Sequence, residues 1–482
     1  MKITLINPSI ANFAIEPCVS EMVDHLNHVQ SAYKQIKFQK HFPSIFNRQI
    51  ARIDRGSSSK TYWPSYGLLS IAGNLEREGF EVHYLEQAFC EDKGIWKHAL
   101  EDAAFSDIVG ITSLTPSAHN AISTGRALKS LNRNVYIVYG GTDASYRSDA
   151  YLYYSGDLVV IGEGEETFLK IVNTPRAKRH QIPGTAWLSN GVDIRNSPAP
   201  PLDLNNLAPP SYHLLDETLR KLSGYYIHSS RGCPYNCNFC AETAFWGHHI
   251  RFKSTKTIIE EIQNLCRNFD VVSGIIHFAD STFALRDEAK VQKIVQELKG
   301  FPDLLFNCNL RGEMRDLSIC KILARGNFFG YTIGMESGSD KMLKGMNKRI
   351  RHSEHLAFLK AAHEFLPIVE SHWIFGFPGE TVRTAEKTIN TIDSLLRQEL
   401  ITEAWPKIYI PYPGTQPHDN PAMFHMQFLN HDYSQYIRSR FPPFKLDAIK
   451  PEKVYSLWME CTERIISTLL DVSPELDSII QD

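Results

Sequence analysis

The chain has 482 residues, of which 43% are hydrophobic and 22% charged, and its formal net charge is −3. This length predicts several domains with large apolar cores, and the composition is typical of a globular protein. The near-neutral charge argues against a nucleic-acid partner. Residues 108–125 lack Asp, Glu, Lys and Arg, but Pro116 and many hydroxyl side chains exclude a membrane span there. The apolar start is broken by Asn7-Pro8, so no signal peptide and a cytoplasmic location are expected.

The first 190 residues alternate short apolar runs with helical patterns. Strands are predicted at 2–6, 81–85, 107–112, 135–139 and 158–161, with helices at 66–78, at 118–131 and from about 166. This alternation predicts an α/β domain over 1–190 with a doubly wound, parallel, Rossmann-like sheet. An insertion at 11–62 interrupts the rhythm, and its structure does not follow from the sequence.

Glycine-rich turns follow two strands of this domain, Gly140-Gly141-Thr142 and Gly162-Glu163-Gly164-Glu165. In a doubly wound sheet, ligands bind beyond the carboxyl ends of the strands. Taken alone, however, the glycines are better explained as tight turns without a ligand. The G-x-G-x-x-G fingerprint is absent, so a dinucleotide is not predicted. Residues 191–220, rich in Pro, Asn and Asp, are predicted to form a linker.

A second alternating series runs through residues 221–420. Its strands are predicted at 225–229, 273–278, 304–309, 330–335, 369–375 and 405–410. Such β/α units predict a partial, TIM-like (β/α)6 barrel, whose site is built from the loops at the carboxyl ends of the strands. Residues 421–482 are predicted to be a small, mostly helical segment that caps the barrel or faces the substrate.

Three cysteines, Cys233, Cys237 and Cys240, lie in the loop after the first barrel strand with the spacing C-x3-C-x2-C. A structural zinc site and a ferredoxin cluster would each want four protein ligands. Three unrelated buried thiols are the alternative, but the intervening Gly, Pro and Asn residues indicate a loop rather than a core. The spacing therefore predicts an iron–sulfur cluster with one iron left for another ligand.

Polar residues and glycine turns collect at the ends of the other barrel strands. They are Asp280, Arg311, Glu336-Ser337, the turn at 376–380 and the turn at 412–415. Carboxylates can bind an ammonium group or ribose hydroxyls, and an arginine can bind a carboxylate. Together with the cluster, these residues would suit a small zwitterionic cofactor.

This combination resembles the radical S-adenosylmethionine (radical SAM) superfamily. The resemblance implies that the three cysteines hold a [4Fe-4S] cluster, that the open iron binds SAM, and that reduction cleaves SAM to a 5′-deoxyadenosyl radical. It also implies a set of SAM-binding residues: Phe239, Asp280, Arg311, Glu336, Ser337, Gly376 and Pro378. The Gly-Gly-Glu triplet that the family often carries on its second strand is absent, and Asp280 stands in that place.

The N-terminal series, with its motif at 64–69 and the two glycine turns, is similar to the cobalamin-binding-type domain found ahead of many radical SAM enzymes. The similarity implies candidate cobalamin contacts at Ser113, Thr115, Gly140, Gly141, Thr142, Gly162, Glu163, Gly164 and Glu165. The Asp-x-His-x-x-Gly motif that supplies a histidine to cobalt is absent. Radical SAM members with this domain commonly lack it too.

The resemblance implies a cobalamin-dependent radical SAM methyltransferase. It would act on an unactivated carbon of a small metabolite or natural-product intermediate, with an external electron donor such as flavodoxin or ferredoxin. A radical cyclase, rearrangement or heteroatom-insertion enzyme on the same scaffold stays open, as does a non-catalytic iron–sulfur sensor or regulator. A methylthiotransferase is disfavoured, because it needs three more N-terminal cysteines and only Cys18 and Cys90 precede the motif. No catalytic side chain and no membrane partner are predicted.

Overall fold

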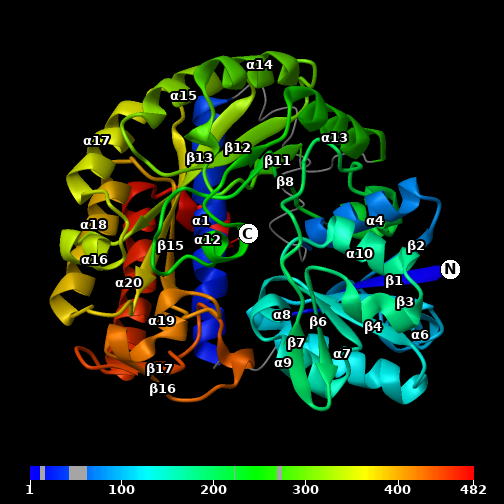
Figure 1. Ribbon diagram of the computed structural model, residues 1–482. Helices are drawn as coiled ribbons and strands as arrows, with labels where there is room; N and C mark the ends of the chain where they lie inside the picture. The colour runs from blue at the N-terminus through cyan, green and yellow to red at the C-terminus, as the bar shows by residue number, and fades with distance from the viewer. Residues whose placement is uncertain (11–16, 43–61, 222, 269–273, 482) are drawn as a thin grey trace. The chain divides into compact units, whose positions relative to one another are not determined.

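The computed structural model describes residues 1–10, 17–42, 62–221, 223–268 and 274–481. The chain divides into two compact units, each described by itself below (Figure 1). The first comprises 1–12, 60–224 and 251–272, and the second comprises 13–59, 225–250 and 273–482. The described part of the predicted insertion at 11–62 thus falls mainly in the second unit, although the sequence analysis attached it to the N-terminal domain.

The first unit contains a seven-stranded sheet in the order β2-β1-β3-β4-β5-β6-β7. Its parallel strands are β1 (Lys2–Asn7), β2 (Glu81–Glu86), β3 (Ile108–Thr112), β4 (Tyr136–Gly140) and β5 (Leu158–Val160). Two further strands, β6 (Thr185–Ser189) and β7 (Val192–Arg195), extend the sheet in antiparallel fashion. The predicted doubly wound parallel sheet is therefore confirmed over β1–β5, and the sheet as a whole is mixed.

The β6–β7 hairpin corrects the prediction that the linker begins at 191. Asn190 and Gly191 form its two-residue turn, with φ of 50° and 79°. Both central residues of a type I′ turn need positive φ, and Asn-Gly is the dipeptide that supplies it most readily. The Asn-Gly dipeptide is visible in the sequence, but the prolines that follow it favoured the interpretation as a linker.

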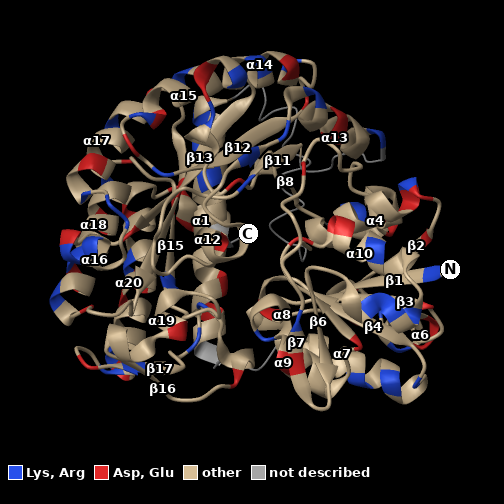
Figure 2. Cartoon of the chain, viewed as in Figure 1, with Lys and Arg blue, Asp and Glu red and all other residues tan. Residues whose placement is uncertain are grey.

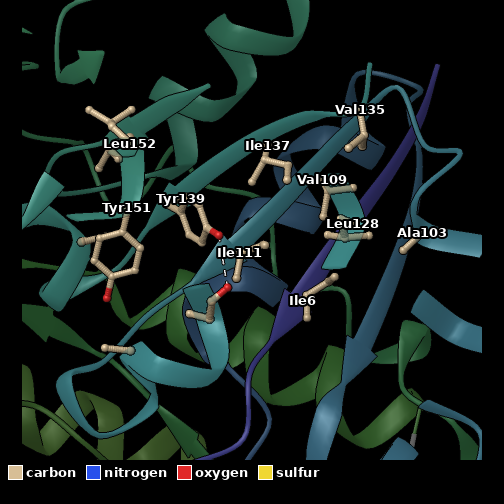
Figure 3. Packing of buried hydrophobic residues seen from close by; sticks show 14 of the residues in the cluster. Ile6, Ala103, Val109, Ile111, Leu128, Val135, Ile137, Tyr139, Tyr151 and Leu152 are labelled. Atoms are coloured by element: carbon tan, nitrogen blue, oxygen red, sulfur yellow. Dashed lines mark hydrogen bonds between the residues drawn. The ribbon is translucent and has the colours of Figure 1, made fainter. Parts of the chain in front are cut away.

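The helices of the first unit are α4 (Tyr66–Arg77), α5 (Gln87–Asp92), α6 (Trp96–Ala103), α7 (Ala118–Leu131), α8 (Thr142–Tyr146), α9 (Ser148–Tyr154), α10 (Glu165–Asn173), α11 (Glu217–Lys221) and α13 (Thr255–Asn268). α4 begins after Ser65, whose hydroxyl accepts a hydrogen bond from the Leu68 N–H. A core of buried side chains fills the space between the sheet and α7 (Figure 3). It includes Val109, Leu128 and Ile137, all of them fully buried. Burial of this layer fixes which strand faces point inward.

Gly125 of α7 provides a direct test of this packing. A Cβ at Gly125 would lie 1.8 Å from the Tyr139 hydroxyl and 2.5 Å from Ser155 Oγ. Gly125→Ala is therefore expected to destabilise the protein by about 1–3 kcal/mol, because the new methyl group overpacks a closed site. The urea midpoint followed by circular dichroism measures the effect. Gly67→Ala in α4 is the control: nothing lies within 4 Å of its Cβ, so the midpoint should stay or rise. Equal midpoints for both variants would contradict this account.

The second unit contains a six-stranded sheet in the order β15-β14-β13-β12-β11-β8. Its strands are β8 (Tyr225–Ile227), β11 (Ile275–Phe278), β12 (Leu305–Leu310), β13 (Phe328–Glu336), β14 (Ile368–Phe375) and β15 (Glu403–Ile408). All neighbours are parallel and successive along the chain. This order confirms the predicted partial barrel. The short segments β9 (Ser230–Arg231) and β10 (Arg251–Phe252) are also extended.

The helices of the second unit are α12 (Ala241–Trp246), α14 (Glu288–Leu298), α15 (Asp316–Leu323), α16 (Asp340–Gly345), α17 (His352–Ala362), α18 (Val382–Arg397), α19 (Gln416–Asp419), α20 (Pro451–Val472) and α21 (Leu476–Gln481). Lys and Arg are interspersed with Asp and Glu along α14 and α17 (Figure 2). Such mixed charge is typical of a solvated helix face.

Several barrel strands alternate fully buried residues on one face with half-buried residues, many of them polar, on the other. On β14, Val369, Ser371, Trp373 and Phe375 are buried, whereas Glu370 and His372 are half-buried. On β12, Asn307 and Asn309 alternate with buried neighbours in the same way. Because successive strand residues point to opposite faces, the helices cover the apolar face and the polar face lines the interior of the barrel.

One long N-terminal helix, α1 (Pro17–His41), packs on α20 and β14 of the second unit. Lys34 pairs with Glu403 at 2.7 Å, and the Gln30 side-chain oxygen accepts the Ala404 N–H at 2.6 Å. In the C-terminal segment, β16 (Met426–Phe428) and β17 (Phe444–Leu446) form an antiparallel pair that the sequence analysis missed. Among the described helices, none has the length and apolar character to cross a bilayer.

Candidate active site

The cysteine loop after β8 is held in shape by its backbone. Gly232 has φ of 100°, and a Cβ there would lie 2.2 Å from the His249 carbonyl oxygen, so only glycine fits. The Asn238 N–H donates to the Met346 carbonyl at 3.0 Å, and Asn347 Nδ2 donates to the Asn236 carbonyl at 2.6 Å. The turn that follows α16 therefore fixes the middle of the loop.

The three predicted cluster ligands lie together in this loop. Cys233 is buried, and Cys237 and Cys240 are half-buried. Burial, followed by the nearby Cys237, raises the pKa of Cys233 to about 11, and burial together with Glu242 raises that of Cys240 to about 12. Buried thiols of this kind become thiolates only beside a strong positive charge, such as metal ions.

Three thiols in one loop suit the ligand set of an iron–sulfur cluster. Among the described residues, no three His, Cys, Asp or Glu side chains are grouped so as to hold one metal ion. The cysteine ligands of a [4Fe-4S] cluster each bind a different iron, so their sulfurs lie farther apart than the donors around one ion. The three thiols would therefore supply one ligand to each of three irons.

Arg311 lies directly beside the cysteine loop at the end of β12. Its Nη1 donates to Cys237 Sγ at 3.6 Å, and its guanidinium lies 3.6 Å from the centre of the Tyr235 ring. Nε donates to Glu313 Oε1 at 2.5 Å. Nη2 is buried and has no hydrogen-bond partner among the described residues. A buried donor of this kind fits an anionic group, such as a carboxylate, next to the cysteines.

Glu336 is the last residue of β13 and has φ of 62°, a conformation that glycine adopts more readily than other residues. Its Oε1 accepts a hydrogen bond from Lys348 Nζ at 3.0 Å, and both side chains are buried. A Cβ at Gly334 would lie 2.2 Å from Glu336 Oε1, so the glycine leaves room for the carboxylate. Its other oxygen, Oε2, makes no hydrogen bond within the described part of the chain. This oxygen can therefore accept hydrogen bonds from hydroxyl groups.

The turn after β14 contains Gly376 with φ of 83° and the buried Pro378. The Gly376 N–H donates to Glu380 Oε2, while Glu380 Oε1 is buried without a partner among the described residues. Burial raises the pKa of Glu380 to about 8. Phe239 of the cysteine loop approaches this turn edge-on, with its ring 6.5 Å from that of Phe377.

Glu380 should make stability depend on pH. Its pKa is about 4.5 in the unfolded chain and about 8 in the folded one. A raised carboxyl pKa leaves stability highest below the unfolded pKa, and stability then falls as pH rises toward 8. Glu380→Gln removes this linkage, so the variant should lose less stability than wild type between pH 5 and 8, with a difference on the order of a few kcal/mol. Urea unfolding across this pH range measures it. Parallel pH profiles for the two proteins would show that Glu380 is not the group responsible.

Two predicted SAM contacts are fully engaged elsewhere. Asp280 is 0% exposed and accepts hydrogen bonds from Ser229 and Ser230, and Arg286 lies 3.7 Å from its Oδ2. Ser337 Oγ bonds Thr388 of α18 at 2.9 Å. Asp280 thus anchors the segment leading into the cysteine loop, and Ser337 attaches the end of β13 to α18. A contact of either residue with SAM stays a prediction.

Comparison with known proteins matches two segments of the chain to family models. Residues 227–392 match the radical SAM superfamily, and residues 54–172 match the B12 binding domain. An uncharacterized methyltransferase of Pyrococcus horikoshii is 30% identical over 366 residues, which cover 74% of this chain and 78% of that protein. The chain belongs to the radical SAM superfamily.

This radical SAM enzyme is also similar to a cyclase and to a methyltransferase of known structure. The anaerobic magnesium-protoporphyrin IX monomethyl ester cyclase of Cereibacter sphaeroides is 24% identical over 68% of this chain and 56% of that protein. Among solved structures, the radical SAM methyltransferase TsrM of Kitasatospora setae, with cobalamin and a [4Fe-4S] cluster bound, matches with a TM-score of 0.66 at 16% identity, covering 96% of this chain and 88% of that one. That match establishes the shared fold. The predicted cofactors of the radical SAM enzyme, a [4Fe-4S] cluster, SAM and cobalamin, are confirmed by the two families.

In the B12-binding unit of the radical SAM enzyme, a hydrogen-bonded network joins the ends of β3 and β4. Asp143, 1% exposed, accepts from Thr115 Oγ1 at 2.7 Å, from the Tyr151 hydroxyl at 2.5 Å and from Arg147. The Tyr151 hydroxyl also bonds Ser113 Oγ at 2.6 Å. Two of the predicted cobalamin contacts, Ser113 and Thr115, thus belong to one network.

The glycine turns at the same sheet edge have different roles. A Cβ at Gly141, with φ of 92°, would lie 2.6 Å from the Ser113 carbonyl, so this glycine lets the β3 and β4 ends approach. Gly162, with φ of 80°, has open space around its Cβ position, and its N–H donates to Ser145 Oγ at 3.0 Å. Gly164 instead allows close packing on Ile71. Gly140 ends β4, and Thr142 begins α8.

The two glutamates predicted to contact cobalamin bond within the protein. Glu163 Oε2 lies 2.6 Å from Arg251 Nη1, and Glu165 Oε1 accepts from Ser70 Oγ at 3.1 Å. Glu165 is buried as well, so its side chain serves the contact between α10 and α4. Their predicted contacts with cobalamin stay predictions.

Several residues of these sites were missed in the sequence analysis. Asp143 could have been found, because it lies in the first helical turn after a glycine-rich strand end. Tyr151 gives no such signal, since an aromatic at helical spacing is more often a core residue. Tyr235 and Lys348 are recognised only once the fold brings them to Arg311 and Glu336.

Proposed function

We propose that this enzyme is a cobalamin-dependent radical SAM methyltransferase that methylates an unactivated carbon of a small metabolite or natural-product intermediate. The observation that carries the proposal is the combination of the two domain families with a methyltransferase relative that is 30% identical across 78% of its length. When bound, the cluster and SAM supply radical initiation, and cobalamin supplies methyl transfer.

The residues of the chain would position these groups. Cys233, Cys237 and Cys240 would hold the cluster, and the unpartnered Nη2 of Arg311 would bind the carboxylate of SAM beside Cys237. Glu336, kept in place by Lys348, would accept hydrogen bonds from the ribose hydroxyls.

The adenine of SAM would lie against the turn that follows β14. Phe239 offers its ring there, and Gly376 and Pro378 shape the turn next to Glu380. A carboxyl group that stays protonated at neutral pH can donate one hydrogen bond and accept another, as an adenine edge requires. An external one-electron donor of the flavodoxin or ferredoxin type would reduce the cluster.

In the N-terminal unit, the network around Asp143 would hold the ends of β3 and β4 in the shape that receives the corrin. Ser113, Thr115 and Gly141 would face it from β3 and β4, and the open turn at Gly162 from β5. The network would serve to orient backbone groups rather than to coordinate cobalt, because its hydroxyls already bond Asp143 and Tyr151.

Methyl-labelled SAM provides the deciding experiment. The purified, anaerobically reconstituted protein is loaded with cobalamin and given the labelled SAM and a chemical reductant. Labelled methylcobalamin together with released 5′-deoxyadenosine supports the methyltransferase. Release of 5′-deoxyadenosine without labelled methylcobalamin would favour a cyclase, which the 24% identity to the cyclase makes the second candidate. If neither product forms, and the spectrum of an intact cluster does not change when SAM is added, the protein would be a sensor.

A further inference from the structure

The polar interior face of the barrel carries a chain of titratable groups that the SAM site does not use. Glu370 Oε1 lies 2.8 Å from His372 Nε2, and His372 Nδ1 lies 3.1 Å from Lys407 Nζ. All three side chains project from β14 and β15 on the same face, where they are half-buried. We call Glu370, His372 and Lys407 the interior triad.

The hydrogen bonds of the interior triad set the role of Lys407. A carboxylate only accepts, so His372 donates through Nε2–H to Glu370. Neutral His372 then presents a lone pair at Nδ1, and the Lys407 ammonium donates to it. Lys407 keeps two further N–H groups, since an ammonium has three. The triad therefore holds a cation on the interior face of the barrel and leaves two of its donors for another ligand.

The backbone of a second cation, Arg438, lies beside Ile408, the residue that follows Lys407. The Ile408 N–H donates to the Arg438 carbonyl at 2.8 Å, which ties the C-terminal segment to the end of β15. Arg438 Nε donates to the Tyr412 hydroxyl at 3.2 Å, and its side chain is exposed. Its charge acts on Lys407, and the charge of Glu336 acts on Arg438 in turn.

Neither cation has a carboxylate within salt-bridge distance among the described residues. The carboxylates that face them are bonded to other groups: Glu336 to Lys348 at 3.0 Å, Glu370 to His372 at 2.8 Å and Glu242 to Ser281 at 3.4 Å. Farther along the same face, Lys34 pairs with Glu403 at 2.7 Å and His277 with Asn307 at 2.9 Å. Burial and the charge of Arg438 lower the pKa of Lys407 to about 8, as expected for an ammonium that lacks a counter-ion.

We propose that Lys407 and Arg438 bind an anionic oxygen group of the substrate, a carboxylate or a phosphate, inside the barrel. The inference deepens the proposed function and rests on it only in taking the barrel interior as the substrate site. Lys407 and Arg438 repel each other electrostatically and neither has a carboxylate counter-ion, so an anion bound to both would remove the repulsion and accept from the donors that His372 and Tyr412 leave free. Because SAM also carries a carboxylate, the test must separate the two sources.

Competitive amine labelling tests this assignment without turnover. The reconstituted holoenzyme is treated at pH 7.5 with trace acetic anhydride, and acetylation of Lys407 is quantified by peptide mass spectrometry. Inorganic phosphate and succinate are the probes, and sodium chloride at equal ionic strength is the reference. An anion that raises the pKa of Lys407 by one unit lowers its reactive free amine up to about tenfold. Lys256, with a side chain 83% exposed, is the internal control and should label equally throughout.

Three variants and one further arm decide the outcome. Protection of Lys407 by phosphate or succinate should disappear in Arg438→Gln and return in part in Arg438→Lys, while the cluster absorbance stays unchanged. His372→Gln removes the hydrogen-bond acceptor of Lys407, so the pH dependence of Lys407 labelling should change. The pH dependence of Lys256 labelling should stay the same. Absence of protection in wild type, or equal protection in Arg438→Gln, would overturn the proposal. So would full protection by SAM alone with no added effect of phosphate, since the anion would then be the carboxylate of SAM. Because no methyl group moves, failure here and failure of methyl transfer are separate results.

Discussion

Replacing Cys237 with alanine is expected to abolish both the iron–sulfur cluster and the cleavage of SAM. Cys237 contacts Arg311 and would supply one of only three protein ligands, so two thiolates would be left to hold the metal. Iron and sulfide content, the visible absorbance of the cluster and release of 5′-deoxyadenosine measure the loss. All should fall to background, because the radical chemistry depends entirely on the cluster.

Cys266→Ala is the matched control for that experiment. Cys266 is a half-buried free cysteine of α13 and lies outside the cysteine loop. Its replacement should leave iron content and SAM cleavage at the wild-type level. A Cys237→Ala protein that keeps a full cluster, or a Cys266→Ala protein that loses it, would show that the loop has been misassigned.

Replacing Arg311 with methionine is expected to weaken SAM binding roughly 10- to 150-fold. Hydrogen bonds to charged groups contribute about 1.5–3 kcal/mol, and Arg311 has a buried donor that no described residue satisfies. Methionine keeps much of the stem that packs on Tyr235 and removes only the guanidinium. Equilibrium binding of SAM to the reconstituted protein gives the change in Kd.

Arg315→Met is the control for Arg311, because it lies in the same loop and also pairs with Glu313, but its side chain is 56% exposed. It should bind SAM as wild type does. Since Arg311 contacts Cys237, the iron content of each variant must be measured as well. Arg311→Lys, which keeps the charge without the planar fork, should fall between wild type and Arg311→Met. An unchanged Kd in an Arg311→Met protein with a complete cluster would exclude this arginine from the SAM site.

Local patterns were sufficient to predict most of the two sheets. Regular alternation of apolar runs and helical stretches identified β1 to β5 and all barrel strands, because each of these strands is a short apolar run that its own sequence marks. The β6–β7 hairpin was missed although Asn190-Gly191 encodes its turn. α1 was not predicted, since its partners on β14, β15 and α20 lie hundreds of residues later and no local signal reveals them.

The residues of the candidate site likewise include some that local sequence predicts and some that only the fold reveals. Cys233, Cys237 and Cys240 are grouped by spacing alone, so the sequence was enough to find them. Which polar side chains turn toward the barrel interior depends on register and on hydrogen bonds. The sequence did not reveal that the Asp280 carboxylate is buried and bonds Ser229 and Ser230, and its contact with SAM stays a prediction. Trp373 could have pointed to either face, and the structure buries it with Nε1 donating to Ser371 at 2.9 Å.

The ion pair between Lys34 and Glu403 joins residues 369 positions apart. The ribosome releases α1 long before it makes the strands and helix that cover it, and domains generally fold as units during synthesis. For most of translation, the apolar face of α1 that includes Val29, Tyr33 and Phe38 therefore has no native partner. A nascent or C-terminally truncated chain should expose this helix to chaperones and proteases, so completion of the barrel unit is coupled to synthesis of the last part of the chain.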